Sequence, residues 1–333
     1  MSWNDPASTN QPFMLRPAAK DYIWGGTRLN DDFNLGVDIY PFAEAWVCST
    51  HPDGEATLDD GRRLSEVLKS NPSMLGTHPL QITKGEPFLP ILIKFIDAKE
   101  DLSVQVHPDD GYAAEHENGS WGKTEMWYVL SARKHSELIY GFRYDVDEGR
   151  VRAAAADGSI GELLNHVPVK KNDLFFINAG TVHAIGSGCL IVEIQENSNI
   201  TYRLYDYDRI DRNGQKRPLH IDKALDVANL RSSAAPRQPM RVLKYRPGCA
   251  YEMLGRCKYF QAERLLLNTE NRLSADFKTG PNSFHVLLVT DGCGNLSGPG
   301  VHMNFFKGDC IFVPADSDEL KLHGQAQIIN VSC

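Results

Sequence analysis

The stretch EDLSVQVHPDDGY, residues 100–112, combines a short β-type run with an abrupt Pro-Asp-Asp turn. Alternate residues of a strand point to the same face, so Gln105 and His107 would lie side by side, about 6.6–6.8 Å apart at the backbone. A core strand would carry apolar residues at both positions. Two polar groups on one face need a common partner, and a metal ion is one candidate.

The rest of the chain continues this pattern of short β-type runs separated by Gly, Pro, Asn and Asp. Such turn-rich spacing is typical of a β-sandwich or β-barrel, and it predicts a mainly β protein. Helical patterns are few, and we expect short helices within residues 64–71, 145–166 and 220–230. The expected strands are PILIKFIDA (90–98), LSVQVH (102–107), EMWYVLSA (125–132), DLFFINA (173–179), CLIVEIQ (189–195) and TYRLYDY (201–207).

A segment rich in Ser, Ala and Pro, RSSAAPRQPMR, interrupts the β pattern at residues 231–241. Domain boundaries commonly fall in segments of this composition. We therefore expect a first, catalytic domain over residues 1–230, with short inserted helices, and a second β-domain over residues 242–333.

The second domain repeats part of the first. Residues 283–296 resemble residues 124–138, which read as a strand, a turn and a strand. Residues 306–322 resemble residues 169–185: both contain a basic residue and an Asp, then an apolar strand and a turn of small residues. The second copy has no His where His183 stands in the first, so we expect one half to carry the chemistry and the other to be structural.

Length and composition narrow the possible classes of protein. A chain of 333 residues with 42% apolar and 23% charged residues is globular and long enough for two domains. The net charge of −8 argues against a general nucleic-acid binder and against docking on an anionic membrane. The N-terminus has no apolar run of signal-peptide length, and no segment approaches the ~20 apolar residues of a membrane span. Seven scattered cysteines without a Cys-x-x-Cys pair then predict reduced thiols in a cytoplasmic protein. The sequence leaves the oligomeric state open, and a homo-oligomer is one of the alternatives.

Two more residues are candidates to share a metal ion with His107. Glu125 begins the run EMWYVL, and His183 lies in the turn INAGTVHAIGSG between two apolar runs, where strand pairing would return it to His107. Taken alone, a histidine is more often a hydrogen-bonded or surface residue, and a glutamate at a strand end is more often solvated. Zinc accepts both ligand types at about 2.0–2.2 Å. Two histidines and one carboxylate also fit non-haem iron, so the residue types leave the metal open.

Five motifs follow one another along the chain: DLSVQVHPDD (101–110), GKTEMWYVL (122–130), AGTVHAIGSG (179–188), IVEIQENSNITYRLYDYDR (191–209) and LHIDKALDV (219–227). A His with a downstream Glu, followed by Asp, an apolar strand, a small-residue turn and a second His, resembles the two motifs of the cupin barrels. In detail the sequence resembles the zinc-dependent mannose-6-phosphate isomerases, or phosphomannose isomerases, of the short bacterial kind. The resemblance runs from about residue 12 to about residue 230, includes WGGTRL (24–29) and AEAWVCSTHPDG (43–54), and is weaker in the last hundred residues.

This resemblance implies a fold of two cupin (jelly-roll) β-barrels with a few short helices, the second barrel without a metal site. It implies one Zn²⁺ per chain and a phosphosugar substrate. The position of Tyr207 usually holds Trp in the family, a departure that puts little in doubt. By matching position, the zinc ligands are His107, Glu125 and His183, with Gln105 as the fourth ligand of longer relatives; the catalytic residues are Arg203, Lys123 and Glu193; and the residues near the sugar phosphate are Lys94 and Ser103.

Several of these residues also have ordinary interpretations. Lys94, in PILIKFI, resembles a solvated lysine on an edge strand. Arg203 lies close in sequence to Asp206 and Asp208, where a surface ion pair would explain it. Glu193 is less ordinary, because a carboxylate within the apolar run LIVEIQ needs a partner or a function.

The implied activity is the interconversion of mannose 6-phosphate and fructose 6-phosphate through a metal-assisted enediolate proton transfer. An ion held by one anionic ligand keeps a net positive charge, and a permanently charged arginine suits a phosphate or an enediolate. Lys123 and Glu193 are both candidates for moving the proton. The alternatives are an isomerase with another sugar preference, a catalytically inactive sugar-phosphate sensor and an iron-dependent cupin oxygenase. Loss of Arg203, Lys123 or a ligand would have favoured the sensor, and all of these residues are present.

Overall fold

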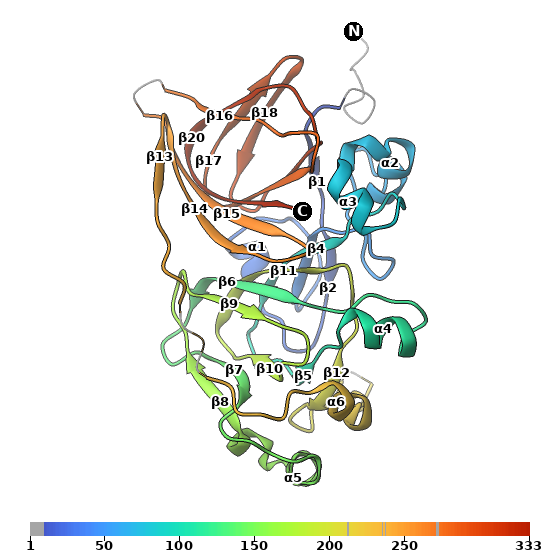
Figure 1. Ribbon diagram of the computed structural model, residues 1–333. Helices are drawn as coiled ribbons and strands as arrows, with labels where there is room; N and C mark the ends of the chain where they lie inside the picture. Colours follow the sequence, from blue (N-terminus) through green and yellow to red (C-terminus); the bar gives the residue numbers. More distant parts are fainter. Residues whose placement is uncertain (1–9, 212, 235, 237, 271–272) are drawn as a thin grey trace.

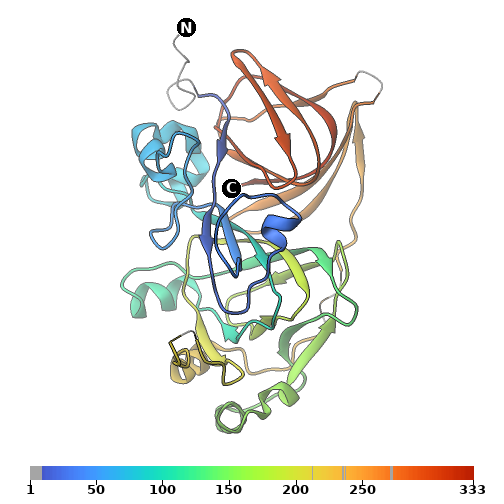
Figure 2. The same ribbon diagram turned by 180° about the vertical axis from the view of Figure 1, so that it is seen from behind.

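The computed structural model describes residues 10–211, 213–234, 236, 238–270 and 273–333. These residues form a mainly β protein with three antiparallel sheets, as the sequence predicts. The strands of the C-terminal segment lie at one end of the molecule, and helices α5 and α6 lie at the opposite end (Figure 1, Figure 2). The first nine residues, which belong to the polar N-terminal stretch, lie outside the described part of the chain.

Two sheets form the half of the molecule that carries the sequence motifs. Core residues from both sheets, such as Trp127 and Ile191 of one and Ile185 of the other, belong to one cluster, so the sheets pack face to face. In order of pairing, the first sheet contains β2 (Ala18–Lys20), β3 (Glu44–Cys48), β4 (Ile91–Asp97), β11 (Cys189–Glu196), β6 (Glu125–Ala132) and β9 (Leu174–Ile177). The second contains β12 (Tyr202–Tyr205), β5 (Val104–Val106), β10 (His183–Ile185), β7 (Glu137–Phe142) and β8 (Leu164–Pro168).

The first sheet is buried on both faces, which explains why its strands read as continuous apolar runs. On β6, Trp127 and Val129 point to the inner face between the two sheets, whereas Met126 and Tyr128 point to the outer face. The outer-face residues share a core cluster with C-terminal residues such as Phe260. The C-terminal segment therefore covers the outer face of the first sheet.

The C-terminal segment forms a nine-stranded sheet that also includes a strand from the N-terminus. Phe13 in β1 pairs with Phe312 in β19, and the two rings stack at 5.2 Å. Strand β1 belongs to the first expected domain in sequence but pairs within the sheet of the second. The domain boundary at residues 231–241 stays a prediction. The strands are β1 (Phe13–Leu15), β13 (Lys244–Arg246), β14 (Cys249–Arg256), β15 (Gln261–Asn268), β16 (Ala275–Phe277), β17 (His285–Gly298), β18 (Val301–Phe306), β19 (Cys310–Val313) and β20 (Leu320–Ser332).

The internal repeat is visible in one of its two parts. Before β9 the carboxylate of Asp173 accepts a bond from the Lys170 amide at 2.9 Å, and before β19 Asp309 accepts one from the Phe306 amide at 2.7 Å. The strand after the following turn begins with His183 in β10 and with apolar Leu320 in β20. The strand–turn–strand expected at 283–296 is wrong, because β17 runs through it as one strand with a register shift after Val289.

Short helices decorate the sheets. The predictions at 64–71 and 220–230 are confirmed, but the segment 145–166 is helical only in part. There α5 ends at Gly158, whose φ of 82° is left-handed; a 3₁₀ turn (Ser159–Leu163) follows, and β8 then pairs with β7. No helix in the described part of the chain is long and apolar enough to cross a membrane. The helices are α1 (Arg28–Asp31), α2 (Leu64–Ser70), α3 (Thr77–Ile82), α4 (Asp110–His116), α5 (Glu148–Asp157) and α6 (Ile221–Val227), with a further 3₁₀ turn at Pro72–Leu75.

A close backbone approach at Gly76 joins the two halves of the molecule. Gly76 has a φ of 85°, and a Cβ atom there would lie 2.7 Å from the carbonyl carbon of Asn282. Gly85 has a φ of 90°, but a Cβ there would meet no atom within 4 Å. We expect Gly76→Ala to lower the free energy of unfolding by about 2–4 kcal/mol and Gly85→Ala by about 1 kcal/mol, because only the first adds a steric clash to the backbone cost. Urea unfolding measures both, and equal losses would contradict this account.

Candidate active site

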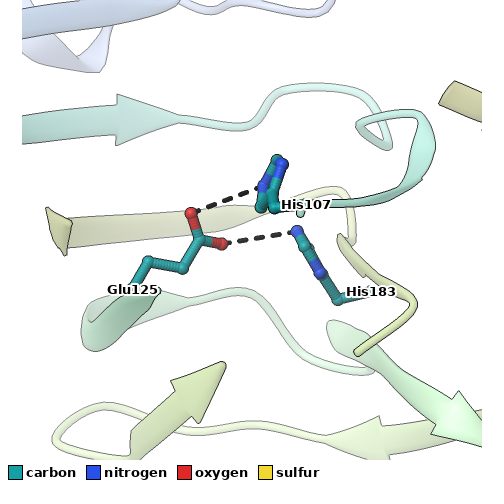
Figure 3. Close-up of side chains that lie close together, drawn as sticks. All are labelled: His107, Glu125 and His183. Carbon is teal, nitrogen blue, oxygen red and sulfur yellow. Dashed lines mark ion pairs between the residues drawn. The ribbon is translucent and has the colours of Figure 1, made fainter. Parts of the chain in front are cut away.

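Three buried side chains from separate strands meet between the two sheets (Figure 3). His107 follows β5, Glu125 begins β6 and His183 begins β10. Their candidate ligand atoms lie within 4.8 Å of one another, and each residue is at most 1% exposed. Glu125 Oε2 lies 3.6 Å from His107 Nε2, and Glu125 Oε1 lies 3.3 Å from His183 Nε2. The arrangement matches the spacing of groups that surround one cation.

The hydrogen bonds of this cluster indicate what its centre requires. His183 donates from Nδ1 to the carbonyl of Thr181 at 2.8 Å, which leaves Nε2 as an acceptor. That Nε2 and Glu125 Oε1 are buried without a hydrogen-bond partner among the described residues. Burial lowers the pKa of His183 to about 4, so its imidazole is neutral, as a metal ligand must be. Buried acceptors that face one another without a donor are satisfied by a cation, so these residues fit a metal ion.

Local structure explains how distant parts of the sequence converge here. The Gly180 amide donates to the carbonyl of His107 at 2.9 Å, and this joins the turn before β10 to the end of β5. In the second sheet Gln105 pairs with His183 on one side and with Arg203 on the other. Gln105 also lines the adjoining cavity, and its role as a ligand stays a prediction.

Lys123 links the His–Glu–His cluster to a cavity of about 250 Å³. Its Nζ lies 2.8 Å from Glu125 Oε2 and 3.0 Å from His107 Nε2, and the residue is 4% exposed. The cavity wall contains all the other residues that the resemblance assigned to the substrate or to catalysis. These residues are Lys94, Ser103, Glu193 and Arg203.

Lys94 and Glu193 form a buried ion pair on neighbouring strands. Lys94 Nζ lies 3.1 Å from Glu193 Oε1 and 3.6 Å from Glu44 Oε2, and Trp127 donates to the other Glu193 oxygen at 2.8 Å. Burial alone would raise the pKa of Glu193, but the charges of Lys94 and Lys123 outweigh it and lower the pKa to about 2. The edge-strand interpretation of Lys94 is wrong, because β4 lies inside the sheet between β3 and β11 and Lys94 is 3% exposed.

A group of arginines lies at another part of the cavity. Arg203 donates from Nε to the hydroxyl of Ser103 at 3.2 Å, and it forms no ion pair among the described residues. Asp206, only 5% exposed, accepts bonds from Arg217 Nε at 2.7 Å and Nη2 at 2.5 Å, and it also pairs with Arg209. The ion pair with Asp206 that was considered for Arg203 is thus made by Arg209 and Arg217 instead. Burial lowers the pKa of Arg203, and the nearby Arg217 charge adds to the effect.

Some residues of the cavity wall were not identified from the sequence. Arg217 follows a polar turn with no periodic pattern, so nothing in the sequence marks it as a pocket residue. Glu44 lies in the apolar run AEAWVC, where a carboxylate needs a partner, and this was a signal in the sequence. In the structure Trp46 Nε1 donates to Glu44 Oε2 at 2.6 Å. Tyr22 and Trp24 come from the segment that follows β2.

Facing antiparallel sheets with a His–Glu–His cluster on their inner side, beside a cavity rich in cationic groups, define a metal-binding protein of the cupin class. Residues 13–131 match the model of the phosphomannose isomerase type I catalytic domain, and residues 252–333 match the mannose-6-phosphate isomerase cupin domain. The chain is 36% identical over 325 residues to the mannose-6-phosphate isomerase ManA of Bacillus subtilis, covering 96% of this chain and 98% of that protein. The chain therefore belongs to the mannose-6-phosphate isomerase family.

Two further relatives agree with this assignment. The mannose-6-phosphate isomerase of Streptococcus mutans is 41% identical over 224 residues, which cover 66% of this chain and 68% of that protein. The crystal structure of the mannose 6-phosphate isomerase from Bacillus subtilis has a TM-score of 0.86 at 32% identity, covering 96% of this chain and 99% of that one. The expected fold class is confirmed by this likeness, and it extends over the C-terminal half, where the sequence resemblance was weak.

The carboxyl groups of Glu196 and Asp110 interact next to the site, and this gives a pH-dependent prediction. Glu196 Oε1 accepts from the Thr124 amide at 2.7 Å, and burial, together with the Asp110 charge, raises the pKa of Glu196 from 4.5 to about 8. Between these pH values the folded chain holds a proton that the unfolded chain has lost, so the free energy of unfolding falls as pH rises. Glutamine does not titrate. We therefore expect the free energy of unfolding of Glu196→Gln, relative to that of the unchanged protein, to be about 2 kcal/mol higher at pH 8 than at pH 5.5. Urea unfolding at the two pH values measures this difference.

The matched control for this prediction is Glu115→Gln on α4, because the Glu115 side chain is 79% exposed. Its stability should follow that of the unchanged protein at both pH values. A Glu196→Gln variant whose relative stability is the same at both pH values would show that Glu196 is ionised throughout.

Proposed function

We propose that this chain interconverts mannose 6-phosphate and fructose 6-phosphate as an aldose–ketose isomerase. The observation that carries the proposal is the position of Lys123, which contacts both His107 and Glu125 and also lines a cavity with Arg203 and Glu193. Metal ligands and groups able to exchange protons thus surround one space. The B. subtilis and S. mutans relatives carry the name of this activity. The alternative of an inactive sensor is not favoured, because the residues whose loss would support it are present.

One zinc ion per chain is the proposed cofactor, held by His107, Glu125 and His183, with Gln105 proposed as the fourth ligand. Two imidazoles and one carboxylate are a common ligand set of catalytic zinc, which leaves a position open for substrate or water. When bound, the ion supplies a positive charge that stabilises oxygens becoming negative during the reaction. Burial raises the pKa of Glu125, with a contribution from the Glu193 charge, and a cation would reverse that shift.

The reaction moves a proton between two neighbouring sugar carbons. Glu193 is ionised and accepts bonds from Lys94 and Trp127, and these contacts would have to loosen before its carboxylate accepted a proton from a carbon placed in the cavity. Lys123 presents an ammonium group beside the metal ligands, where it can donate a hydrogen bond to an enediolate oxygen. Both groups are at most 4% exposed, which keeps bulk water from the transferred proton.

Charge pairing suggests where the phosphate binds. Lys94 is neutralised by Glu193 and Glu44, and Lys123 is paired with Glu125. In contrast, Arg209 and Arg217 share the single carboxylate of Asp206, and Arg203 forms no ion pair among the described residues, so an excess of positive charge lies near Arg203 and Arg217. Guanidinium groups also match phosphate geometry. We therefore place the phosphate at Arg217, leave Arg203 to act on the reacting oxygens, and assign Lys94 to holding Glu193.

The test of the function is turnover of mannose 6-phosphate by the purified protein. We expect fructose 6-phosphate to form, the reaction to stop after chelation and dialysis, and stoichiometric zinc to restore it. Metal analysis of the protein as isolated should give one ion for each chain. Binding of sugar phosphate without turnover by the zinc-loaded protein would support the sensor, and oxygen consumption with bound iron would support an oxygenase.

Two arginine substitutions separate the proposed roles. Arg203→Ala should lower kcat by about 100-fold or more with metal retained, since it removes a donor that acts in the transition state. Arg217→Ala should raise KM for mannose 6-phosphate by about 10- to 100-fold with a smaller change in kcat, because a charge-assisted bond to the substrate is lost. Steady-state kinetics and metal analysis measure both effects.

Lys216→Ala is the control for the arginine pair, because Lys216 pairs with exposed Asp208 and its side chain is 62% exposed. Its kinetics should match those of the unchanged protein. Loss of metal from Arg203→Ala would contradict the role assigned to Arg203, and an unchanged KM in Arg217→Ala would remove Arg217 from the phosphate site.

A further inference from the structure

A turn from the C-terminal half reaches the segment that leads into Glu125. Residues 257–260 connect β14 to β15, and the Tyr259 hydroxyl donates to Asp110 Oδ2 at 2.7 Å. Lys258 Nζ lies 3.2 Å from the same oxygen. Asp110 begins α4, three residues after His107. The turn thus contacts the helix that directly follows a proposed metal ligand.

The other oxygen of Asp110 holds the backbone that precedes Glu125. Asp110 Oδ1 accepts from the Gly122 amide at 3.2 Å, and the Lys123 amide donates to the carbonyl of Pro108 at 3.0 Å. A Cβ atom on Gly122 would lie 2.5 Å from the backbone of Asp109 and Asp110. The segment therefore lies directly against the start of α4 and moves with it.

Neighbouring contacts complete the support of this segment. Ser198 Oγ donates to the carbonyl of Trp121 at 3.0 Å, and the Thr124 amide donates to Glu196 at 2.7 Å. These two contacts come from the first half of the chain. Side chains of the 257–260 turn join this support through Asp110, and Tyr259 also lies near Glu196.

The turn itself is held firmly on the first sheet. Phe260 is 1% exposed and its ring lies 6.1 Å from the ring of Phe176 on β9. A Cβ atom on Gly255 would lie 2.7 Å from the sulfur of Met126 on β6. The Cys257 amide closes the turn by donating to the carbonyl of Phe260 at 2.9 Å. A turn seated in this way can fix Asp110 more precisely than solvent could.

We propose that Tyr259 is a positioning residue of the active site: through Asp110 it fixes Gly122, and so holds Lys123 against His107 and Glu125. This inference rests on the proposed function, since it assigns the C-terminal half a part in the same reaction. It gives that half a role in catalysis without a metal ligand or a contact with substrate.

Tyr259→Phe tests the inference, because it removes one hydroxyl and keeps the ring. We expect kcat for mannose 6-phosphate to fall by about 3- to 30-fold, since small displacements of positioned groups are costly, with KM and zinc content unchanged. Tyr245→Phe is the control: Tyr245 lies on β13 of the same sheet and is 79% exposed, so its kinetics should not change. Unchanged kcat in Tyr259→Phe would overturn the proposal.

Two further measurements separate positioning from a general loss of stability and from failure of the proposed function. In a double-mutant cycle with Asp110→Ala, Tyr259→Phe should have no further effect on kcat, whereas additive effects would overturn the route through Asp110. Hydrogen exchange of a peptide spanning residues 121–125 should be faster in Tyr259→Phe than in Tyr245→Phe, with equal exchange elsewhere. This readout needs no activity, so equal exchange at 121–125 would refute the positioning even if the chain were no isomerase.

Discussion

The structure depends on one electrostatic constraint: Glu125 Oε1 and the acceptor nitrogen of His183 face each other in the buried interior, with no donor between them among the described residues. Buried acceptors of this kind are costly unless a cation or a proton satisfies them. The cost is localised, because the inner face changes from polar at Glu125 to apolar at Trp127 and Val129 within one strand. The metal position is thus determined by the pleat of β6 and by the two strands of the opposite sheet that bring the histidines.

Polar residues on the inner face stabilise the fold less than apolar ones would, and apolar packing on the outer faces of the two sheets contributes the rest. Met126 and Tyr128 of β6 pack with residues of the C-terminal sheet, and α5 and α6 cover the second sheet through residues such as Val151 and Leu225. The C-terminal half therefore has a first role in burial. The same packing brings its 257–260 turn to the edge of the site, where a catalytic contribution requires only a few polar side chains.

The sequence predicted the strands because their period and turns are local signals, and the family resemblance named His107, Glu125 and His183, which the structure brings together. It failed where burial depends on partners distant in the chain. Lys94 reads as a solvated charge because the sequence does not reveal the carboxylates on β3 and β11 that neutralise it. Arg217 was missed because it belongs to a loop, and the end of the segment 145–166 was read as helix because its pairing with β7 is a tertiary contact.

The distribution of charge has a consequence for the proposed reaction. The lysines of the cavity are paired with carboxylates near the metal cluster, whereas the unneutralised charge lies with Arg203 and Arg217. A sugar phosphate carries its two negative charges at one end and its carbonyl at the other. With the phosphate proposed at Arg217, the carbonyl end of the sugar faces Arg203, Lys123 and Glu125. Because a single orientation is favoured before any proton moves, binding energy at the phosphate is converted into alignment at the reacting carbons.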